Sequence, residues 1–286
     1  MLVDLALLWS WQRLVVRYFN GKVAESAGAT SVQLKNQGRD IRTGWRASRL
    51  GTVISRELSL WHGDMRRRTQ LLSVAIMTLV SGFGPLISSS IPFSAAWGAW
   101  FLIYLAMAAG SNLYGFDGAS IWHLVMIPEA AAADVRGRQI AWAIVMTPFV
   151  VVATAAVRIF GDLGTDRLAV PLAVGISMMG VGAGLAVAIS AKAPYPVPEM
   201  KKTFSLNTRG SFNGSSFGLI ILAIVIFAAT TAPGVLLGAL LPNPVNYFAI
   251  PVAVAIGALG AWIGGRVAIT RMQREPDRIL FAVTTA

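Results

Sequence analysis

The sequence predicts an all-α polytopic membrane protein with six full transmembrane helices, an N-terminal partial transmembrane helix, and interfacial and coupling helices on the cytoplasmic side. Hydrophobic residues make up 55% of the 286 residues and charged residues only 13%, whereas soluble domains carry about 25% charged residues. The mean hydropathy is +0.64. The charges gather between long apolar runs, as expected of helices that cross a bilayer.

The charge balance and the missing cysteine exclude several classes of function. The net charge is +11, but Lys and Arg collect in the short cytoplasmic loops of membrane proteins. Because no soluble basic domain with interleaved aromatic residues is present, nucleic acid is not an expected partner. A chain without cysteine forms no disulfide, thiolate metal site or cysteine nucleophile.

Residues 1–19 are predicted to form a partial or terminal transmembrane helix. The apolar run Leu2–Val16 is slightly shorter than the roughly 20 residues that span a bilayer. Arg13 and Arg17 near its end place that end in the cytoplasm, and an interfacial anchor helix is the alternative. Residues 20–51 are polar and basic, which is typical of a cytoplasmic linker with little fixed structure.

Residues 52–70 are predicted to form an amphipathic interfacial helix. Ile54, Leu58, Trp61 and Met65 recur at helical spacing and share one face, with the charged residues expected elsewhere. An aromatic residue on the apolar face and an arginine cluster suit a membrane surface; an ordinary solvated helix is the alternative. The candidate interfacial residues are Arg56, Glu57, Trp61, Arg66, Arg67 and Arg68.

Residues 71–271 are predicted to form a six-helix transmembrane domain. Its expected spans are Leu71–Ile91, Phe93–Asn112, Ile140–Phe160, Leu168–Ser190, Leu219–Leu241 and Tyr247–Ile269. Glycines in the fourth and sixth of these spans allow close contacts between helices. They are Gly175, Gly180, Gly182 and Gly184 in the fourth, and Gly257, Gly260, Gly264 and Gly265 in the sixth.

The distribution of charge predicts the orientation of these spans. Lys or Arg occurs before the first full span, in the loop between the second and third, in the linker 191–217 and in the tail 272–286, whereas the three opposite turns contain only Arg167. Both ends of the core are therefore expected in the cytoplasm. Three prolines near the start of the linker favour an extended polyproline conformation.

The cytoplasmic loop 112–139 is the candidate functional segment. Asp117 is placed to cap a short interfacial helix, Gly118–Ile127. Pro128 ends that helix and begins a second, Glu129–Arg136. Gly137 fits a C-terminal cap. A merely structural loop is the alternative.

The sequence contains no recognisable catalytic set. The only histidines are His62 and His123, which without nearby carboxylates make a poor metal site. Neither a phosphate-binding Gly-rich loop nor a Gly-x-Ser-x-Gly turn occurs. We therefore expect no catalytic residue, metal or cofactor in this chain. Few ionisable groups lie within the spans, which argues against ion-coupled transport and favours an energy source elsewhere.

Three short motifs resemble a known family. Asn-Leu-Tyr-Gly-Phe-Asp-Gly at 112–118, followed by Ile-Pro at 127–128 and Arg-Gly-Arg-Gln at 136–139, is similar to the signature loop of bacterial ABC-2 type exporter permeases. Tyr114 stands where that family usually has Phe, and Arg138 where it has Lys. Pro-Tyr-Pro-Val-Pro-Glu at 194–199 resembles the cytoplasmic linker of actinobacterial members, and Arg56-Glu57-Leu58 with Arg66–Arg68 resembles their interfacial helix.

The resemblance implies the transmembrane subunit of an ABC exporter in the bacterial cell membrane. Its loop would contact a separate nucleotide-binding subunit, which binds ATP and Mg²⁺. The residues that match the family's coupling region, and would contact this partner, are Asp117, Gly118, Pro128, Glu129, Arg136, Gly137 and Arg138.

The resemblance also implies further partners. Many family members have two six-helix halves, and this chain corresponds to a C-terminal half, so a second permease half or a homodimer is expected. Membrane lipid is the remaining partner. An ion-coupled secondary transporter and a non-transporting anchor or assembly subunit are the alternatives.

Overall fold

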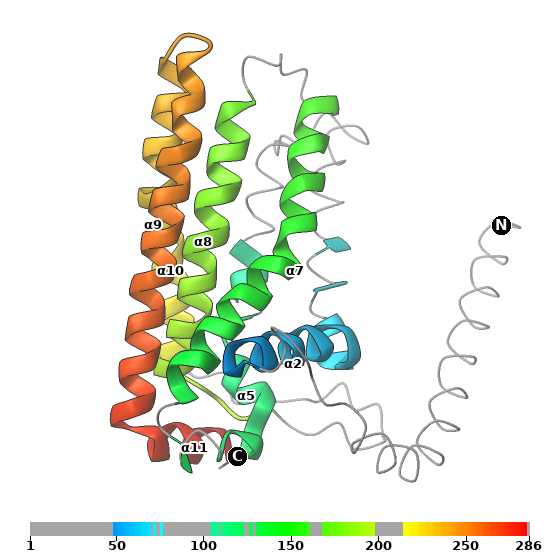
Figure 1. The fold of residues 1–286 in the computed structure, drawn as a ribbon, viewed down its shortest axis with the longest axis vertical. Helices are drawn as coiled ribbons and strands as arrows, with labels where there is room; N and C mark the ends of the chain where they lie inside the picture. The colour runs from blue at the N-terminus through cyan, green and yellow to red at the C-terminus, as the bar shows by residue number, and fades with distance from the viewer. Residues whose placement is uncertain are drawn as a thin grey trace, which may run out of the picture. The chain divides into compact units, whose positions relative to one another are not determined.

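The computed structural model of the chain is predominantly helical in the part that it describes. The described residues are 48–69, 71–72, 75–76, 104–108, 110–122, 126–127, 130–160, 168–197 and 214–284. They contain no strand, which confirms the all-α prediction. From Arg49 onward they belong to one compact unit (Figure 1).

The helices of this unit are named in chain order. They are α2 (Arg49–Gly63), α5 (Leu113–Asp117), the 3-10 helix η2 (Gly118–Ile121), α7 (Ala131–Phe160), α8 (Ala169–Lys192), α9 (Gly214–Leu240), the 3-10 helix η5 (Val245–Phe248), α10 (Ala249–Arg274) and α11 (Pro276–Thr284). A further helical turn covers residues 65–69 after a break at Asp64.

Four helices are long and apolar enough to cross a membrane: Ala131–Val152, Ala169–Lys192, Phe217–Leu240 and Val245–Arg274. They overlap the last four predicted spans, although Ala131–Val152 begins nine residues before the predicted Ile140–Phe160, so the membrane-embedded character of the chain is supported. The predicted spans Leu71–Ile91 and Phe93–Asn112 lie largely outside the described residues, as do the predicted N-terminal helix and basic linker.

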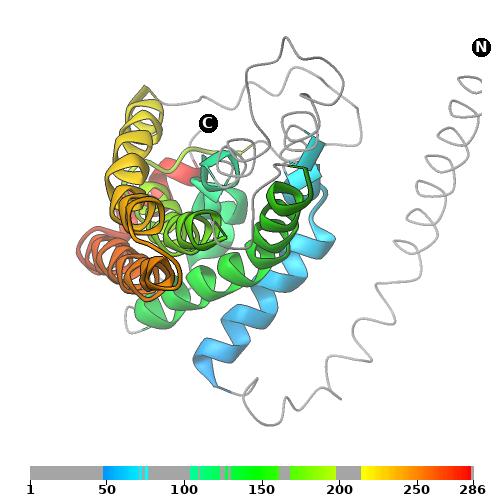
Figure 2. The same ribbon diagram turned by 90° about the horizontal axis from the view of Figure 1, so that it is seen from above.

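Helix α8 lies at the centre of the apolar helices. It packs against α7, α9 and α10, and Figure 2 shows these helices gathered around it. In its apolar stretch 72% of the residues are buried, against 17% for α9. The exposed apolar side chains of α9 therefore form a surface of the kind that contacts membrane or another protein.

The glycines of α8 and α10 bring the two helices into backbone contact, as predicted. A Cβ atom added to Gly180 would lie 2.5 Å from the backbone of Gly257. One added to Gly184 would overlap the backbone of Gly260, and one added to Gly264 would overlap that of Gly184. In a membrane such close approach maximises van der Waals contact between helices.

The predicted two-helix structure of the cytoplasmic loop is wrong in its second part. Helix α7 begins at Ala131 and continues through Gly137 into the apolar span, so the helix does not end at Arg136. Gly137 is not a cap; a Cβ there would lie 2.5 Å from the Cγ1 atom of Val53 on α2. A glycine is required at position 137 because a larger side chain would prevent the contact with α2.

The first part of the loop also differs from the prediction. Asp117 is the last residue of α5 rather than an N-cap, and the chain turns at Gly118, where φ is +53°. The 3-10 helix η2 covers 118–121, with Trp122 and Met126 also helical. Pro128 and Glu129, predicted to begin the second helix, lie outside the described residues.

The tail folds back onto this segment. Helix α10 extends to Arg274, and after Glu275 the chain forms α11. The buried Ile279 and Val283 of α11 join the core that contains Ile121 of η2, and α11 packs against η2. The tail thus contributes to the same end of the molecule as the predicted coupling loop.

The contact between α8 and α10 gives a test. Gly184→Ala should lower the melting temperature of the detergent-solubilised protein, because the new methyl group meets backbone and overpacking costs about 1–3 kcal/mol. Gly218→Ala in α9 is the matched control, since nothing lies within 4 Å of its added Cβ. Alanine is the better helix former, so the control should be neutral or stabilising. Equal melting temperatures for both variants would contradict the close contact.

Candidate functional site

The predicted coupling segment lies where several helices meet. Helix α2 lies beside the first part of α7 (Figures 1 and 2), and the absence of a side chain at Gly137 allows Val53 to approach closely. Helix α5 packs against α8 and η2. The described residues of the loop are thus surrounded by parts of the chain that are distant in sequence.

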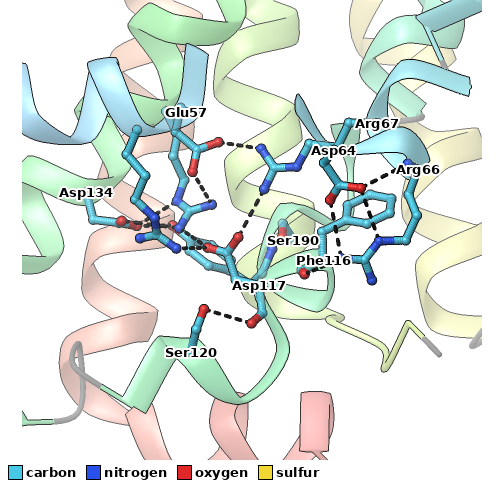
Figure 3. Close-up of polar contacts among 12 residues, drawn as sticks. Glu57, Asp64, Arg66, Arg67, Phe116, Asp117, Ser120, Asp134 and Ser190 are labelled. Atoms are coloured by element: carbon cyan, nitrogen blue, oxygen red, sulfur yellow. Dashed lines mark hydrogen bonds and ion pairs between the residues drawn. The ribbon is translucent and has the colours of Figure 1, made fainter. Parts of the chain in front are cut away.

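Five buried charged residues meet at this point and form what we call the charge cluster. They are Glu57 from α2, Arg67 from the turn 65–69, Asp117 from the end of α5, and Asp134 and Arg138 from α7 (Figure 3). Their side chains are between 0% and 3% exposed. At the edge of the cluster lies Arg56 of α2, whose side chain is 33% exposed.

Arg138 contacts all three carboxylates of the charge cluster. Its Nε and Nη2 atoms donate to the two carboxylate oxygens of Asp134, at 2.8 and 3.2 Å. Its Nη2 atom also donates to Asp117 Oδ2. Its Nη1 atom lies 3.0 Å from Glu57 Oε1, although these two atoms lack the geometry of a hydrogen bond, so this contact is a charge–charge attraction.

Arg67 is the second bridge between the segments. Its two terminal nitrogens bind Glu57 Oε2 at 2.6 Å and Asp117 Oδ1 at 3.0 Å. Arg56 adds a bond to Asp117 Oδ2 at 3.2 Å. Asp117 therefore accepts from three arginines on three segments, which explains why an acidic residue is needed at this position of the loop.

Aromatic rings cover the arginines of this region. The guanidinium carbon of Arg138 lies 4.6 Å from the centre of the Tyr114 ring, and that of Arg67 lies 5.6 Å from the Trp61 ring. Arg66 and Arg67 both lie near the Phe116 ring, at 5.7 and 5.8 Å. Ring faces attract cations and exclude water, so they strengthen the ion pairs that they cover.

The charges of this site balance. Glu57, Asp117 and Asp134 supply three negative charges, and Arg56, Arg67 and Arg138 supply three positive ones. Removing an ion from water costs several kcal/mol, and the cost is recovered only where partners and hydrogen bonds replace the water. Removal of any one partner should therefore be more harmful than removal of an exposed ion pair.

The two ionisable groups of α5 respond to this environment in opposite directions. Burial alone raises the pKa of Asp117, but the attraction of Arg138, Arg56 and Arg67 outweighs it and lowers the pKa below the ordinary value of 3.8. Burial and the neighbouring Asp134 carboxylate raise the pKa of Tyr114 well above its ordinary value. At neutral pH the first is ionised and the second is a neutral hydroxyl, which donates to Asp134 Oδ2 at 3.2 Å.

Two of the motifs noted in the sequence, at 112–118 and 194–199, contact each other. The side chain of Asn112 donates to the carbonyl of Tyr195 at 2.9 Å and accepts from its N–H at 3.1 Å. The backbone N–H of Tyr114 donates to Ser190 Oγ on α8 at 2.9 Å. Gly115 lies against the Tyr195 carbonyl, where a Cβ would clash. The loop is thus bound to α8 and to the start of the linker as well as to α2 and α7.

The structure distributes the predicted site residues among several environments. Asp117, Arg138, Glu57 and Arg67 come together in the charge cluster, and Trp61 covers it. Arg136 and Arg68 are exposed, and Arg66 binds Asp64 at the edge. Gly118 forms the turn and Gly137 the contact with α2, whereas Pro128 and Glu129 lie outside the described residues. Contact of these residues with a partner protein remains a prediction.

Three residues of the site were not predicted. Asp134 is four residues before Arg138, a spacing that pairs opposite charges on a helix. This ion pair could therefore have been predicted from the sequence. Asn112 and Tyr114 belong to the quoted motif, but their partners Tyr195 and Ser190 are too far along the chain to be inferred. Glu57 was expected on the charged side of its helix and is instead buried beside Ile54 and Trp61.

The chemistry of the site is that of a structural connection. Every carboxylate of the charge cluster is bound to an arginine, and Asp117 has too low a pKa to exchange protons near neutral pH. Within the described ranges no group of three or more His, Cys, Asp or Glu is placed to bind a metal. No protein-family model, curated protein or solved structure matches this chain.

The central position of Arg138 gives a test. Arg138→Gln should lower the free energy of unfolding by about 3–5 kcal/mol, since it leaves buried carboxylates without a partner. Arg138→Lys keeps the charge but loses the planar donors and should cost about 1–3 kcal/mol. The exposed neighbour in the control, Arg136→Gln, should change it by less than about 0.5 kcal/mol. Thermal unfolding in detergent measures all three, and equal effects at 136 and 138 would contradict the cluster.

The low pKa of Asp117 predicts a pH dependence. Its folded-state pKa lies below the unfolded value, so its ion pairs stabilise the fold above about pH 4, and this stabilisation is lost as pH falls through the folded-state pKa. The difference in melting temperature between wild type and Asp117→Asn should therefore be constant from neutral pH down to about pH 5. Below that it should shrink. A difference that widened in acid would disprove the assignment.

Proposed function

We propose that the chain is the transmembrane permease subunit of an ATP-driven exporter. The observation that carries the proposal is the charge cluster: the segment that resembles the exporter signature loop is bound, through buried ion pairs, to the first turns of an apolar spanning helix. The family resemblance suggests the class of transporter. The charge cluster provides a physical connection through which a force applied to the loop would move the membrane helices.

A subunit that is driven from outside needs a rigid connection between the contact surface and the membrane helices. Asp117 binds α7 through Arg138 and the α2 region through Arg67, and Tyr114 binds α8 through Ser190. Displacing the loop from α7 or the α2 region would separate buried charges, and displacing it from α8 would break a buried hydrogen bond, so a force on the loop moves these segments with it. This is the property that coupling to an ATPase requires.

The surface available to the ATPase is formed by other residues than those of the charge cluster. Arg136 is exposed on α7, two residues from both Asp134 and Arg138 of the buried pair and therefore on the opposite side of the helix. Trp122, Met126 and Ile127 expose 59%, 70% and 51% of their surface. Exposed apolar and basic side chains both suit a protein contact, whose core is apolar and whose rim is polar. We assign partner contact to this surface and the internal connection to Asp117 and Arg138.

The remaining features of the proposal follow from the resemblance. ATP and Mg²⁺ bind in the partner subunit, and a second permease half or a second copy of this chain completes the pathway. Six spans with cytoplasmic ends in a bacterial cell membrane agree with the distribution of Lys and Arg. The interfacial placement of α2 belongs to the same proposal.

An ion-coupled transporter is the second candidate, and one observation bears on it. Asp134 and Arg138 belong to the apolar stretch Ala131–Val152, and ionisable residues in spans often bind or relay ions. Here both are bound to each other and to further charges in the cluster. The pairing favours a structural role for them and leaves the ATP-driven proposal stronger.

The proposal is tested with the full-length tagged chain purified from its own membranes. A Walker-type ATPase should co-purify with it, and Arg136→Glu should reduce its recovery roughly tenfold, equivalent to about 1.4 kcal/mol of binding. The melting temperature of this variant should be unchanged. Arg278→Glu, at a side chain that is 75% exposed on α11, is the charge-matched control and should retain the ATPase.

Two outcomes would reject this function. If no ATPase co-purified under conditions that preserve other membrane complexes, the chain would be an anchor or assembly subunit. If transport by reconstituted membranes continued with a hydrolysis-deficient ATPase but stopped when the ion gradient was removed, the secondary transporter would be correct.

A further inference from the structure

A basic pocket lies where the C-terminal ends of α8 and α10 meet. It is open, has a volume of about 370 Å³, and its charged lining residues are Lys192, Arg266, Arg271, Arg274 and Glu275. None of these residues belongs to the charge cluster. The pocket is therefore a separate feature that the proposed coupling role does not use.

The pocket has an excess of positive charge. Its one lining carboxylate, Glu275, binds Arg271 and also Arg278 outside the lining, the latter at 2.7 Å. Within the described part of the chain, Lys192, Arg266 and Arg274 have no acidic partner. The Nε atom of Arg271 is buried and has no hydrogen-bond partner. An anion in this pocket would meet several unpaired donors and would relieve the repulsion among the cations.

Helix-end electrostatics explain only part of this arrangement. Cations near the C-terminus of a helix are attracted to its free carbonyl groups, which accounts for Arg271 and Arg274 on α10 alone. The pocket, however, adds Lys192 from the end of a second helix and Arg266 from a position two turns before the end of α10. Cations from two helices around one concave space are the pattern of a headgroup site.

The surface next to the pocket identifies the source of the anion. The Arg266 guanidinium lies over the Trp262 ring, 5.1 Å from its centre, and Trp262 is 55% exposed. On the same helix, Leu259, about one turn before Trp262, is 55% exposed, and Ile263, the residue after it, is 49% exposed. Tryptophan is enriched at the level of lipid headgroups, so an apolar surface that suits acyl chains leads directly into the basic pocket.

We propose that this pocket binds the phosphate headgroup of an anionic phospholipid, with its acyl chains along the exposed apolar face of α10. The guanidinium groups donate to the phosphate oxygens, as arginine does in other phosphate sites. The lipid would join the ends of α8 and α10, beside the point where α11 begins.

The experiment uses the purified full chain in neutral detergent. Native mass spectrometry and thermal unfolding are compared after addition of phosphatidylglycerol, phosphatidylcholine or inorganic phosphate. Phosphatidylglycerol should remain bound and raise the melting temperature, whereas the zwitterionic lipid and free phosphate should not. The double variant Arg266→Gln, Arg274→Gln should weaken retention at least roughly tenfold, and Lys192→Gln should weaken it less.

The variants are chosen so that the result is interpretable. All three substituted side chains are exposed, so they should leave the fold intact, which the melting temperature without lipid checks. Arg49→Gln removes one positive charge, as Lys192→Gln does, from an exposed residue outside the pocket and should retain the lipid. Equal retention of both lipids, or loss in the Arg49 variant equal to that in the double variant, would overturn the proposal. An equal shift with inorganic phosphate would show a free-anion site and overturn the lipid assignment.

Discussion

The Arg138 guanidinium lies within reach of three carboxylates and is fully buried, and the arrangement of the surrounding helices depends on this contact. A guanidinium in such a place is stable only if each of its neighbours stays within hydrogen-bonding distance, because the water it has lost cannot return. The positions of α2, α5 and α7 are therefore not independent. A membrane protein has little hydrophobic driving force between its helices, and here buried charge supplies the specificity that apolar packing alone would lack.

The α8 and α10 contact uses the opposite means. There the helices carry glycine where they meet, and their backbones touch without charge or hydrogen-bonding side chains. Helix α8 belongs to both arrangements, since it contacts α10 through glycine and α5 through Ser190. The molecule thus combines a contact that depends on shape, in the apolar part, with one that depends on charge at its end.

The sequence predicted the helical class, the four spans that can be compared with the structure, and the glycine contact, because each depends on local composition. It failed where one residue type serves two purposes. Glycine is common at helix ends, so Gly137 was predicted to be a cap. Its position is instead restricted by Val53, which is distant in the sequence, and no residue near position 137 indicates that contact. Glu57 looks like a solvent-facing residue because its partners Arg67 and Arg138 are brought to it only by folding. Asp117 was expected to cap a helix and to contact a partner, and its ion pairs could not be predicted because the three arginines that bind it come from other segments.

Helix α11 packs on η2, and this has a consequence for the order in which the molecule is completed. The ribosome makes the loop segment well before it makes α11, so the apolar surface around Ile121 has no cover from Ile279 and Val283 while the last spans are being inserted. The region that we associate with coupling reaches its final structure only after the whole described chain has been synthesised. A chain that stalls or is cut before α11 therefore exposes this apolar surface, which is the kind of signal that membrane proteases and chaperones detect.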